Sequence, residues 1–287
     1  MSKNTQNKTR TTKNNISLHP NLDTVQVMGI LNVTPDSFSD GGKFTCFDNA
    51  LKQVEQMIHN GVDIIDIGGE STRPGAVDVS VQDEISRVIP LLKAIKSRFD
   101  INVSIDTSKS EVMGEAITYG AGMINDVRAL QNKGCIDVVA QSDIAICLMH
   151  MQGMPRTMQE NPQYGDVIND ILEFFKQRIR CCEQQGVNKE RLILDPGFGF
   201  GKTLAHNYEV LAQFSQFTSL GLPVLAGISR KSMIGNLLNR EMDERLAGSL
   251  TAAIVAVQQG ANIIRVHDVQ ESVDAINILK AVAQYKK

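Results

Sequence analysis

Two aspartates and one asparagine stand where short apolar runs of the sequence end. Asp106, Asn125 and Asp195 each come directly after such a run. A carboxylate accepts two parallel hydrogen bonds from an amidine-like or guanidine-like edge, and an amide both donates and accepts. We therefore expect the three side chains to bind the N–H-rich edge of a flat amino-heterocycle. The alternatives are a general-base role for one aspartate, or a purely structural role for either.

Cationic side chains and histidines follow other apolar runs. Lys231 comes shortly after the seventh run, and Arg265 lies two residues before His267, on the same face of the eighth. We expect these three groups to converge on one anion. His150 ends a further run and is a second histidine candidate for the site. The sequence has no HExxH motif or paired histidine spacing, which argues against a structural zinc site.

The glycine-rich string DPGFGFGKT (195–203) looks like a phosphate-binding loop but fits neither common pattern. A Walker A loop needs glycine where Pro196 stands, and a dinucleotide fingerprint needs glycine where Lys202 stands. The glycine spacing instead predicts backbone crowded against a flat ligand, or a tight turn between a strand and a helix. We expect Phe198 and Phe200 to line a pocket rather than the core.

Two turn-rich loops, at 32–42 and 69–75, follow the first two apolar runs. Both are long enough to close over a site, although ordinary surface loops are the alternative. The second contains Thr72 and Arg73, a pair that is unusual in a solvated turn and suited to gripping a carboxylate or phosphate.

The elements that would position these residues follow a strand–helix alternation. Eight continuous apolar runs, typical of parallel strands buried on both faces, lie at 25–31, 62–67, 102–105, 122–124, 144–149, 191–194, 224–228 and 262–266. Helical periodicity between them is clearest at 81–97 and 167–185. The pattern predicts an α/β fold with a single (β/α)8 TIM barrel, whose active site lies at the carboxyl ends of the strands. A doubly wound open sheet is the alternative.

Charge and composition exclude several classes of protein. The 287 residues include 29 Lys and Arg against 32 Asp and Glu, a net charge of −3 that argues against nucleic-acid binding. No apolar run approaches the roughly 18 residues of a membrane span. The five cysteines form no CxxC motif and suggest reduced thiols, hence a cytoplasmic protein. Residues 1–20 are polar and basic and are expected to be a disordered tail, which leaves 21–287 as the catalytic domain.

Eight strings together resemble the dihydropteroate synthase family, in order and at barrel spacing, over nearly the whole chain after about residue 20. They are GILNVTPDSFSDGG (29–42), DIGGESTRPGA (66–76), SIDTSK (104–109), INDV (124–127), LMHMQGMPRTMQ (148–159), LDPGFGFGK (194–202), GISRKS (227–232) and RVHDV (265–269). No motif position departs from the family pattern. The resemblance implies a TIM barrel that joins (7,8-dihydropterin-6-yl)methyl diphosphate to p-aminobenzoate, with Mg²⁺ required, to give dihydropteroate and diphosphate.

The resemblance also implies residue roles. For pterin diphosphate they fall on Thr72, Asp106, Asn125, Met149, Asp195, Phe198, Gly227, Lys231, Arg265 and His267. For p-aminobenzoate, and for the sulfonamides that occupy its site, they fall on Thr72, Arg73, Pro74, Phe200, Lys231 and Ser232. Asn32 is the implied Mg²⁺ ligand, and the groups nearest the chemistry are Asp106, Lys231, Arg73 and Asn32. An SN1-like order is expected because breaking the bond to diphosphate is the hard step.

The family usually forms homodimers, and the small residues at 246–257 would permit close helix packing. Three rival functions remain open from the sequence. They are a corrinoid-dependent methyltetrahydrofolate methyltransferase, a sugar-phosphate lyase or isomerase barrel, and a barrel that binds pterin or a partner protein without turnover.

Overall fold

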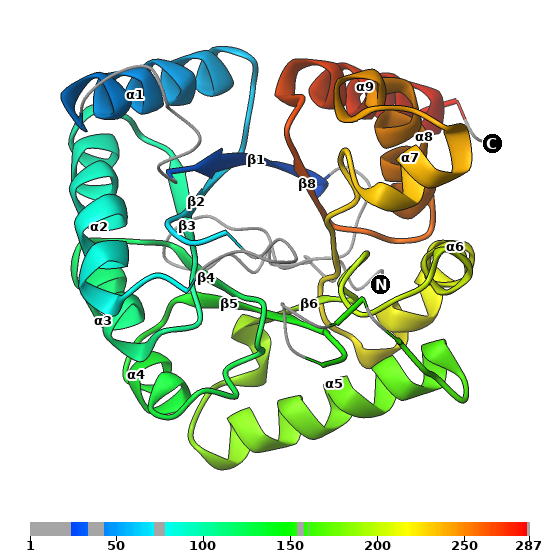
Figure 1. Ribbon diagram of the computed structural model, residues 1–287, viewed down its shortest axis with the longest axis horizontal. Coiled ribbons are helices and arrows are strands. Elements are labelled where there is room, and N and C mark those ends of the chain that lie inside the picture. Colours follow the sequence, from blue (N-terminus) through cyan, green and yellow to red (C-terminus); the bar gives the residue numbers. More distant parts are fainter. Residues whose placement is uncertain (1–23, 34–42, 72–77, 154–157, 160, 286–287) are drawn as a thin grey trace, which may run out of the picture.

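The computed structural model describes residues 24–33, 43–71, 78–153, 158–159 and 161–285. These residues form eight parallel strands, ringed by helices (Figure 1). Hydrogen bonding gives the strand order β6-β5-β4-β3-β2-β1-β8-β7, and a parallel bridge between Leu194 and Val224 links β6 to the segment that leads into β7. The predicted single (β/α)8 barrel is therefore confirmed, and the open doubly wound sheet is excluded.

The bounds of the elements follow the predicted runs closely. The strands are β1 (Gln26–Asn32), β2 (Ile64–Gly68), β3 (Asn102–Asp106), β4 (Met123–Asp126), β5 (Ala145–Met149), β6 (Leu192–Asp195), β7 (Leu225–Ala226) and β8 (Ile263–Val266). The helices are α1 (Lys43–His59), α2 (Val81–Arg98), α3 (Ser110–Thr118), α4 (Cys135–Ala140), α5 (Val167–Gln184), α6 (Leu204–Ala212), α7 (Ser232–Leu238), α8 (Leu246–Gln258) and α9 (Val269–Ala283). Short 3-10 helices are η3 (Lys189–Arg191), η4 (Phe214–Leu220) and η5 (Met242–Glu244). Every strand end lies within two residues of its prediction.

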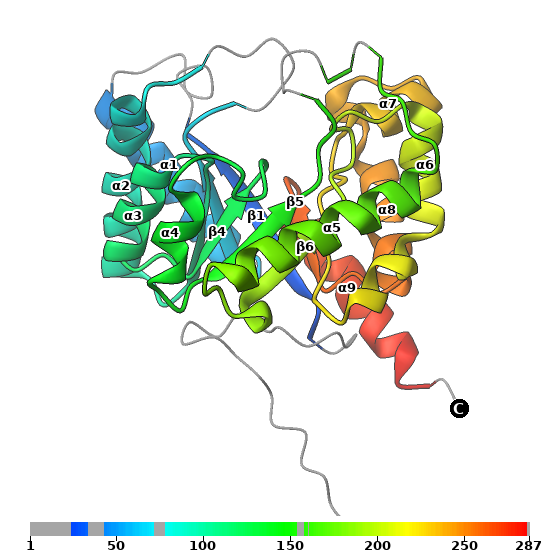
Figure 2. The same cartoon turned by 90° about the horizontal axis from the view of Figure 1, so that it is seen from below.

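Helix α2 illustrates how the sequence specifies the outer layer. The hydroxyl of its N-cap residue, Ser80, accepts a hydrogen bond from the backbone N–H of Asp83, which satisfies one donor of the first turn. Val88, Leu92 and Ile95 recur at helical spacing and are fully buried against the sheet. The side view in Figure 2 shows the helices flanking the strands in this way around the barrel.

An apolar layer fills the interior of the barrel. Its eight fully buried side chains come from seven of the strands and are Met28, Ile64, Met123, Ala145, Cys147, Ile193, Leu225 and Ile263. A separate and larger cluster packs the outer faces of the strands against the helices. The polar strand ends therefore lie above an apolar layer, and this arrangement confines the polar side chains of the site to one end of the barrel.

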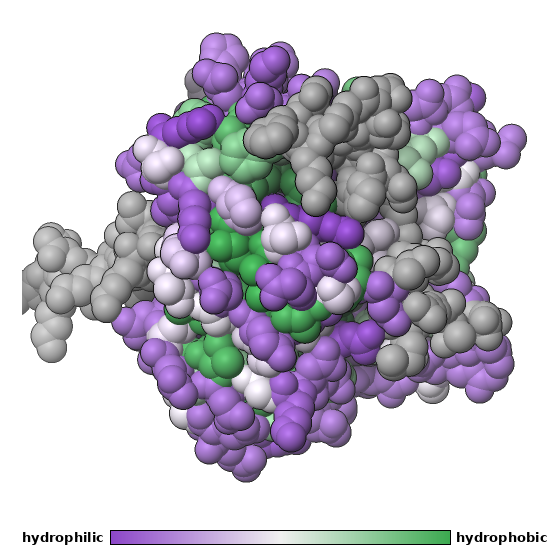
Figure 3. Space-filling model, turned by 60° about the vertical axis from the view of Figure 1, so that its left-hand side comes forward, coloured by the Kyte–Doolittle hydropathy of each residue, from purple (hydrophilic) through white to green (hydrophobic). Residues whose placement is uncertain are grey.

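The outer surface is mainly hydrophilic on the face drawn in Figure 3, where hydrophobic side chains lie between polar ones. None of the described helices is both long and apolar enough to cross a membrane. The predicted tail at 1–20 lies outside the described residues, so the division into tail and catalytic domain stays a prediction.

Candidate active site

Side chains from four strands meet at the carboxyl end of the barrel. Arg265 of β8 donates from Nε to Oδ2 of Asp66, at 2.6 Å, and from Nη2 to Oδ2 of Asp106, at 2.9 Å. Asn125 of β4 donates from Nδ2 to the same oxygen of Asp66, at 3.2 Å. The structure thus brings together three predicted residues and adds Asp66, which the sequence interpretation did not single out.

The carboxylate of Asp106 is electrostatically unusual. Burial removes its solvation and raises its pKa to about 7, while the neighbouring Arg265 guanidinium opposes the rise. The negative charge of Asp66 adds to the rise. Asp106 therefore changes its protonation state close to neutral pH.

Asp195 ends β6 on the other side of the barrel mouth. Its Oδ1 accepts the backbone N–H of Gly197 at 2.7 Å, and burial raises its pKa. Gly227 faces the same region, since a Cβ there would lie 3.9 Å from both Oδ2 of Asp195 and Cβ of Arg265. A side chain at 227 would therefore contact both Asp195 and Arg265.

Lys231 contacts the glycine-rich loop. Its ammonium donates to the backbone carbonyl of Phe198 and lies 4.6 Å from the ring centroid of Phe200. Burial lowers the pKa of Lys231 to about 8, although the charge of Asp195 opposes this. Ser232 is the exposed first residue of α7, directly after Lys231.

The two phenylalanines of the glycine-rich loop have different environments. Phe198 is fully buried and stacks on Phe214, with ring centroids 6.2 Å apart and an interplanar angle of 6°. The expectation that Phe198 lines a pocket is therefore wrong, because its ring belongs to the core and presents no surface to a ligand. Phe200 is partly exposed beneath Lys231. Met149, at the end of β5, is buried.

Lys202 is a functional candidate that the sequence interpretation missed. Its buried ammonium donates to the carbonyls of Gly197 at 2.8 Å and Phe200 at 3.2 Å, and lies 3.0 Å from Nδ1 of His150. Burial and the charge of Lys202 hold the pKa of His150 well below its usual value. His150 therefore acts as a neutral acceptor inside the wall of the site. The only sequence signal was a lysine at the end of a glycine-rich loop.

The glycine-rich loop is crowded, but against the protein's own backbone rather than against a ligand. Gly197 has a φ of +69°, and a Cβ there would overlap the carbonyl oxygen of His150. The loops that follow β5 and β6 are thus in backbone contact, which only glycine permits.

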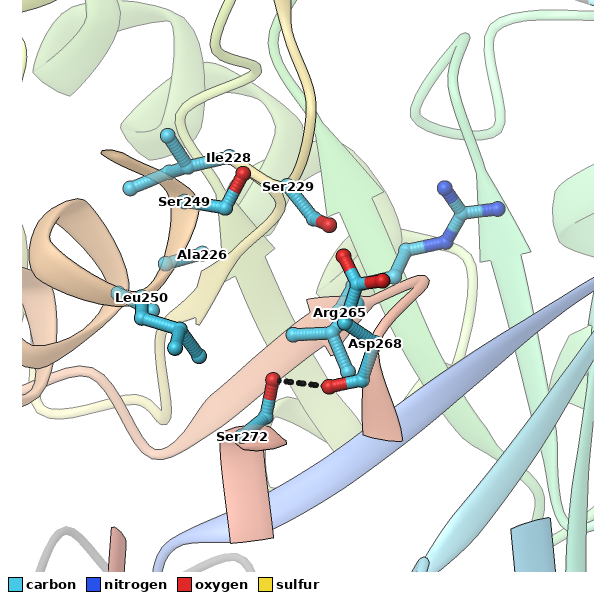
Figure 4. A pocket seen from close by; sticks show the side chains of 10 residues that line it. Ala226, Ile228, Ser229, Ser249, Leu250, Arg265, Asp268 and Ser272 are labelled. Carbon is cyan, nitrogen blue, oxygen red and sulfur yellow. Dashed lines mark hydrogen bonds between the residues drawn. The ribbon is translucent and has the colours of Figure 1, made fainter. Parts of the chain in front are cut away.

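The residues predicted to bind an anion lie at the ends of β7 and β8. The hydroxyl of Ser229 accepts the backbone N–H of His267 at 3.2 Å and lies 3.1 Å from its ring Nδ1. Arg230, which has a φ of +56°, donates from Nε to Asp268 at 3.0 Å. Figure 4 shows Ser229, Arg265 and Asp268 around a small pocket at the start of α9. Lys231, Arg265 and His267 thus come from adjacent strand ends.

Asn32 lies at the end of β1, paired in register with Gly68. A Cβ at Gly68 would lie 3.4 Å from Oδ1 of Asn32 and 3.9 Å from Oδ2 of Asp106, so these two oxygens flank the glycine. Among the described residues, no group of three His, Cys, Asp or Glu side chains is arranged to hold a metal. One amide and one carboxylate oxygen still suit Mg²⁺, which usually takes one or two protein oxygens and completes its shell with phosphate and water.

Three predicted site residues lie outside the described part of the chain, namely Thr72, Arg73 and Pro74. Glu70 lies just before this segment and Val79 just after it, and Oε1 of Glu70 accepts the backbone N–H of Val79 at 2.8 Å. Its Oε2 accepts from Lys109 at 2.7 Å, and Lys109 also pairs with the buried Glu84. These contacts fix where the segment leaves and rejoins the barrel.

Comparisons with known proteins agree with this geometry. Residues 28–267 match the family described as pterin binding enzyme. The chain is 54% identical over 261 residues to the dihydropteroate synthase of Escherichia coli K12, covering 91% of this chain and 93% of that protein. It is 51% identical over 262 residues to the Haemophilus influenzae enzyme, covering 91% and 95%.

Solved structures give the same result. The Yersinia pestis dihydropteroate synthase with a sulfonamide drug has a TM-score of 0.88 at 51% identity, covering 92% of this chain and 96% of that one. The Xanthomonas albilineans enzyme in complex with 7,8-dihydropteroate has a TM-score of 0.84 at 44% identity, covering 93% and 96%. The chain belongs to the dihydropteroate synthase family of pterin-binding transferases.

Proposed function

We propose that this chain condenses (7,8-dihydropterin-6-yl)methyl diphosphate with p-aminobenzoate to give 7,8-dihydropteroate and diphosphate. One observation carries the proposal, namely that Asp106, Asn125 and Asp195 gather at one end of the barrel beside the cations of β7 and β8. Acceptors suit the donor-rich edge of a pterin, and adjacent cations suit a diphosphate. The relatives support it, since one solved X. albilineans structure contains 4-aminobenzoic acid and another 7,8-dihydropteroate.

The pterin would be held edge-on by the acceptors. Asp195 and Asn125 accept its N–H groups, and Lys231 donates to its carbonyl side. In the structure Lys231 donates to the carbonyl of Phe198, so pterin binding replaces one carbonyl partner by another. Arg265 covers the ring face from β8.

The diphosphate would be held where β8 meets α9. Arg265, His267 and the start of α9 receive its negative charge, and Asn32 with Asp106 nearby would hold Mg²⁺. The ion, when bound, supplies stabilisation of the charge that develops on the leaving group.

Bond breaking would precede bond making. The C–O bond to diphosphate breaks with its electron pair leaving on the diphosphate oxygen, and the buried carboxylates stabilise the resulting pterin carbocation. The neutral amine of p-aminobenzoate then attacks with its lone pair and loses a proton afterwards, so the site needs no strong base. Phe200, Lys231 and Ser232 would line the p-aminobenzoate side, together with Thr72, Arg73 and Pro74. We expect sulfonamides to compete there, as the drug-bound Y. pestis structure suggests.

We further propose that the protein is a cytoplasmic homodimer. The small residues of α8 give weaker support than the sequence suggested, because Ala252, Ala253 and Ala256 are buried within the chain itself. Leu237, Leu238 and Met242 are exposed large hydrophobics on and after α7, and they offer a contact surface. Light scattering during gel filtration would give twice the mass of 31.5 kDa for a dimer.

Turnover is tested with purified protein, both substrates and Mg²⁺, by measuring diphosphate release. Release should depend on p-aminobenzoate and give dihydropteroate in equal amount. Methyl transfer to a corrinoid protein, or release of a sugar-phosphate product, would instead favour a rival barrel enzyme. Tight pterin binding without any turnover would show that the protein binds pterin but is not an enzyme.

A further inference from the structure

Asp66 is a fully buried carboxylate in the middle of β2, beneath the strand ends that form the site. Its Oδ2 accepts two hydrogen bonds, from Nε of Arg265 at 2.6 Å and from Nδ2 of Asn125 at 3.2 Å. Its Oδ1 accepts none from the described residues. One carboxylate of β2 therefore contacts side chains from β4 and from β8, which lie on opposite sides of it in the sheet.

The contact with Asn125 fixes which end of that amide a ligand meets. An ionised carboxylate only accepts hydrogen bonds, so the edge of Asn125 that faces Asp66 is its NH₂ group. The side-chain carbonyl oxygen of Asn125 then faces away from Asp66 and can accept a hydrogen bond from a ligand. No hydrogen bond to this oxygen is formed within the described part of the chain. Without Asp66, the amide is free to present either a donor or an acceptor.

The contact with Arg265 fixes a second group. The guanidinium is held in one plane because its Nε binds Asp66 while its Nη2 binds Asp106. Asp66 also affects Asp106 through space, since its negative charge is among the causes that raise the pKa of Asp106. Asp66 thus acts on three members of the site without being accessible to a substrate.

We propose that Asp66 is a positioning residue for pterin recognition, which turns the carbonyl oxygen of Asn125 toward the pterin N–H groups and fixes the guanidinium plane of Arg265. The inference rests on the proposed pterin site. It adds a residue whose contribution is made entirely through its neighbours.

The main test is the variant Asp66→Asn, which keeps the side-chain shape. The probe is the dihydropterin alcohol, which lacks the diphosphate, and its affinity is measured by calorimetry. We expect affinity to fall about 10- to 100-fold, because an amide at 66 no longer dictates the orientation of Asn125. Asp63→Asn is the matched control, since Asp63 precedes β2 at the other end of the barrel and its carboxylate accepts the backbone N–H of Val27 at 2.7 Å. That control should bind the probe as the wild type does.

A double-mutant cycle separates positioning from general damage. In an Asn125→Ala background, Asp66→Asn should cost much less affinity than it costs in the wild type. Full additivity of the two losses would overturn the proposal, as would wild-type affinity in Asp66→Asn.

The wild-type protein allows a check that needs no variant to fold. The side-chain NH₂ of Asn125 should exchange slowly with solvent in the free protein, as seen by nitrogen-15 NMR. Exchange as fast as that of exposed side-chain amides would overturn the proposal. Wild-type diphosphate release tests the reaction separately, so a positive cycle in a protein without turnover would keep the role of Asp66 and reject the reaction.

Discussion

The ammonium of Lys202 lies 3.0 Å from the ring Nδ1 of His150, inside the wall formed by the loops after β5 and β6. The same ammonium holds the carbonyls of Gly197 and Phe200. Gly197 in turn donates its N–H to Asp195. A buried amino group with three acceptors therefore supports the loop that presents Asp195, and burial holds the pKa of this Lys202 amine well below its usual value.

Replacing this amino group should weaken both the fold and the site. Lys202→Met leaves buried acceptors without a donor, and each such loss costs about 1–3 kcal/mol. We expect the free energy of unfolding in urea to fall by at least about 2 kcal/mol, with weaker pterin binding in the folded fraction. Lys176→Met, on the exposed face of α5, should leave the urea midpoint unchanged. Equal midpoints for wild type and Lys202→Met would contradict the structural role.

Pterin binding should have a narrow pH optimum. Asp106 accepts hydrogen bonds best when ionised, and its pKa of about 7 predicts that affinity declines as the pH falls below 7. Lys231 donates best when protonated, and its pKa of about 8 predicts a decline as the pH rises above 8. Calorimetry with the dihydropterin alcohol avoids titration of the diphosphate.

Two variants assign the limbs of that profile. Lys231→Arg should remove the alkaline decline, because a guanidinium stays protonated. Asp106→Asn should remove the acid decline, at reduced affinity throughout. A flat wild-type profile between pH 6 and 9 would reject both assignments.

Asp195→Asn should impair pterin binding more than its small change suggests. The amide oxygen at 195 would keep the hydrogen bond from Gly197, so its NH₂ would face the N–H groups of the pterin. An unpaired buried polar group costs about 1–3 kcal/mol, which predicts an affinity loss of roughly 10-fold or more with the fold intact. Asp48→Asn, on the exposed side of α1, is the comparison. Unchanged calorimetric affinity would remove Asp195 from the pterin site.

Arg73→Ala should chiefly impair capture of p-aminobenzoate. The carboxylate is the strong anion of that substrate, whereas Lys231 and Arg265 are assigned to the pterin and diphosphate. Charge-assisted hydrogen bonds contribute about 1.5–3 kcal/mol, so kcat/KM for p-aminobenzoate should fall roughly 10- to 150-fold. Direct pterin binding should change little. A variant with wild-type kcat/KM would show that Arg73 is an ordinary surface residue.

The sequence predicted the barrel and the polar strand ends because both are local patterns. Asp106, Asn125 and Asp195 follow apolar runs, and parallel strands bring such positions to one edge. Asp66 escaped notice because it lies inside its run, at 62–67, where a polar residue reads as an interruption.

The errors have a different physical origin. The burial of Phe198 depends on Phe214, which packs against it only after α6 folds back. The stabilisation of the glycine-rich loop by Lys202 involves His150, which comes from the neighbouring loop after β5. Contacts between residues so far apart in sequence leave no periodic signal, so they become visible only in three dimensions.

The apolar layer of the barrel interior has a kinetic consequence. The barrel is closed below its polar strand ends by Met28, Ile64, Ile193 and the other side chains of that layer. Substrates and products would therefore enter and leave through the same end of the barrel. In the proposed site the pterin would lie nearest this layer, and p-aminobenzoate would lie above it, between the pterin and the open end of the barrel. With a single route of entry, this arrangement predicts that the pterin substrate binds before p-aminobenzoate and that the condensed product leaves as one molecule.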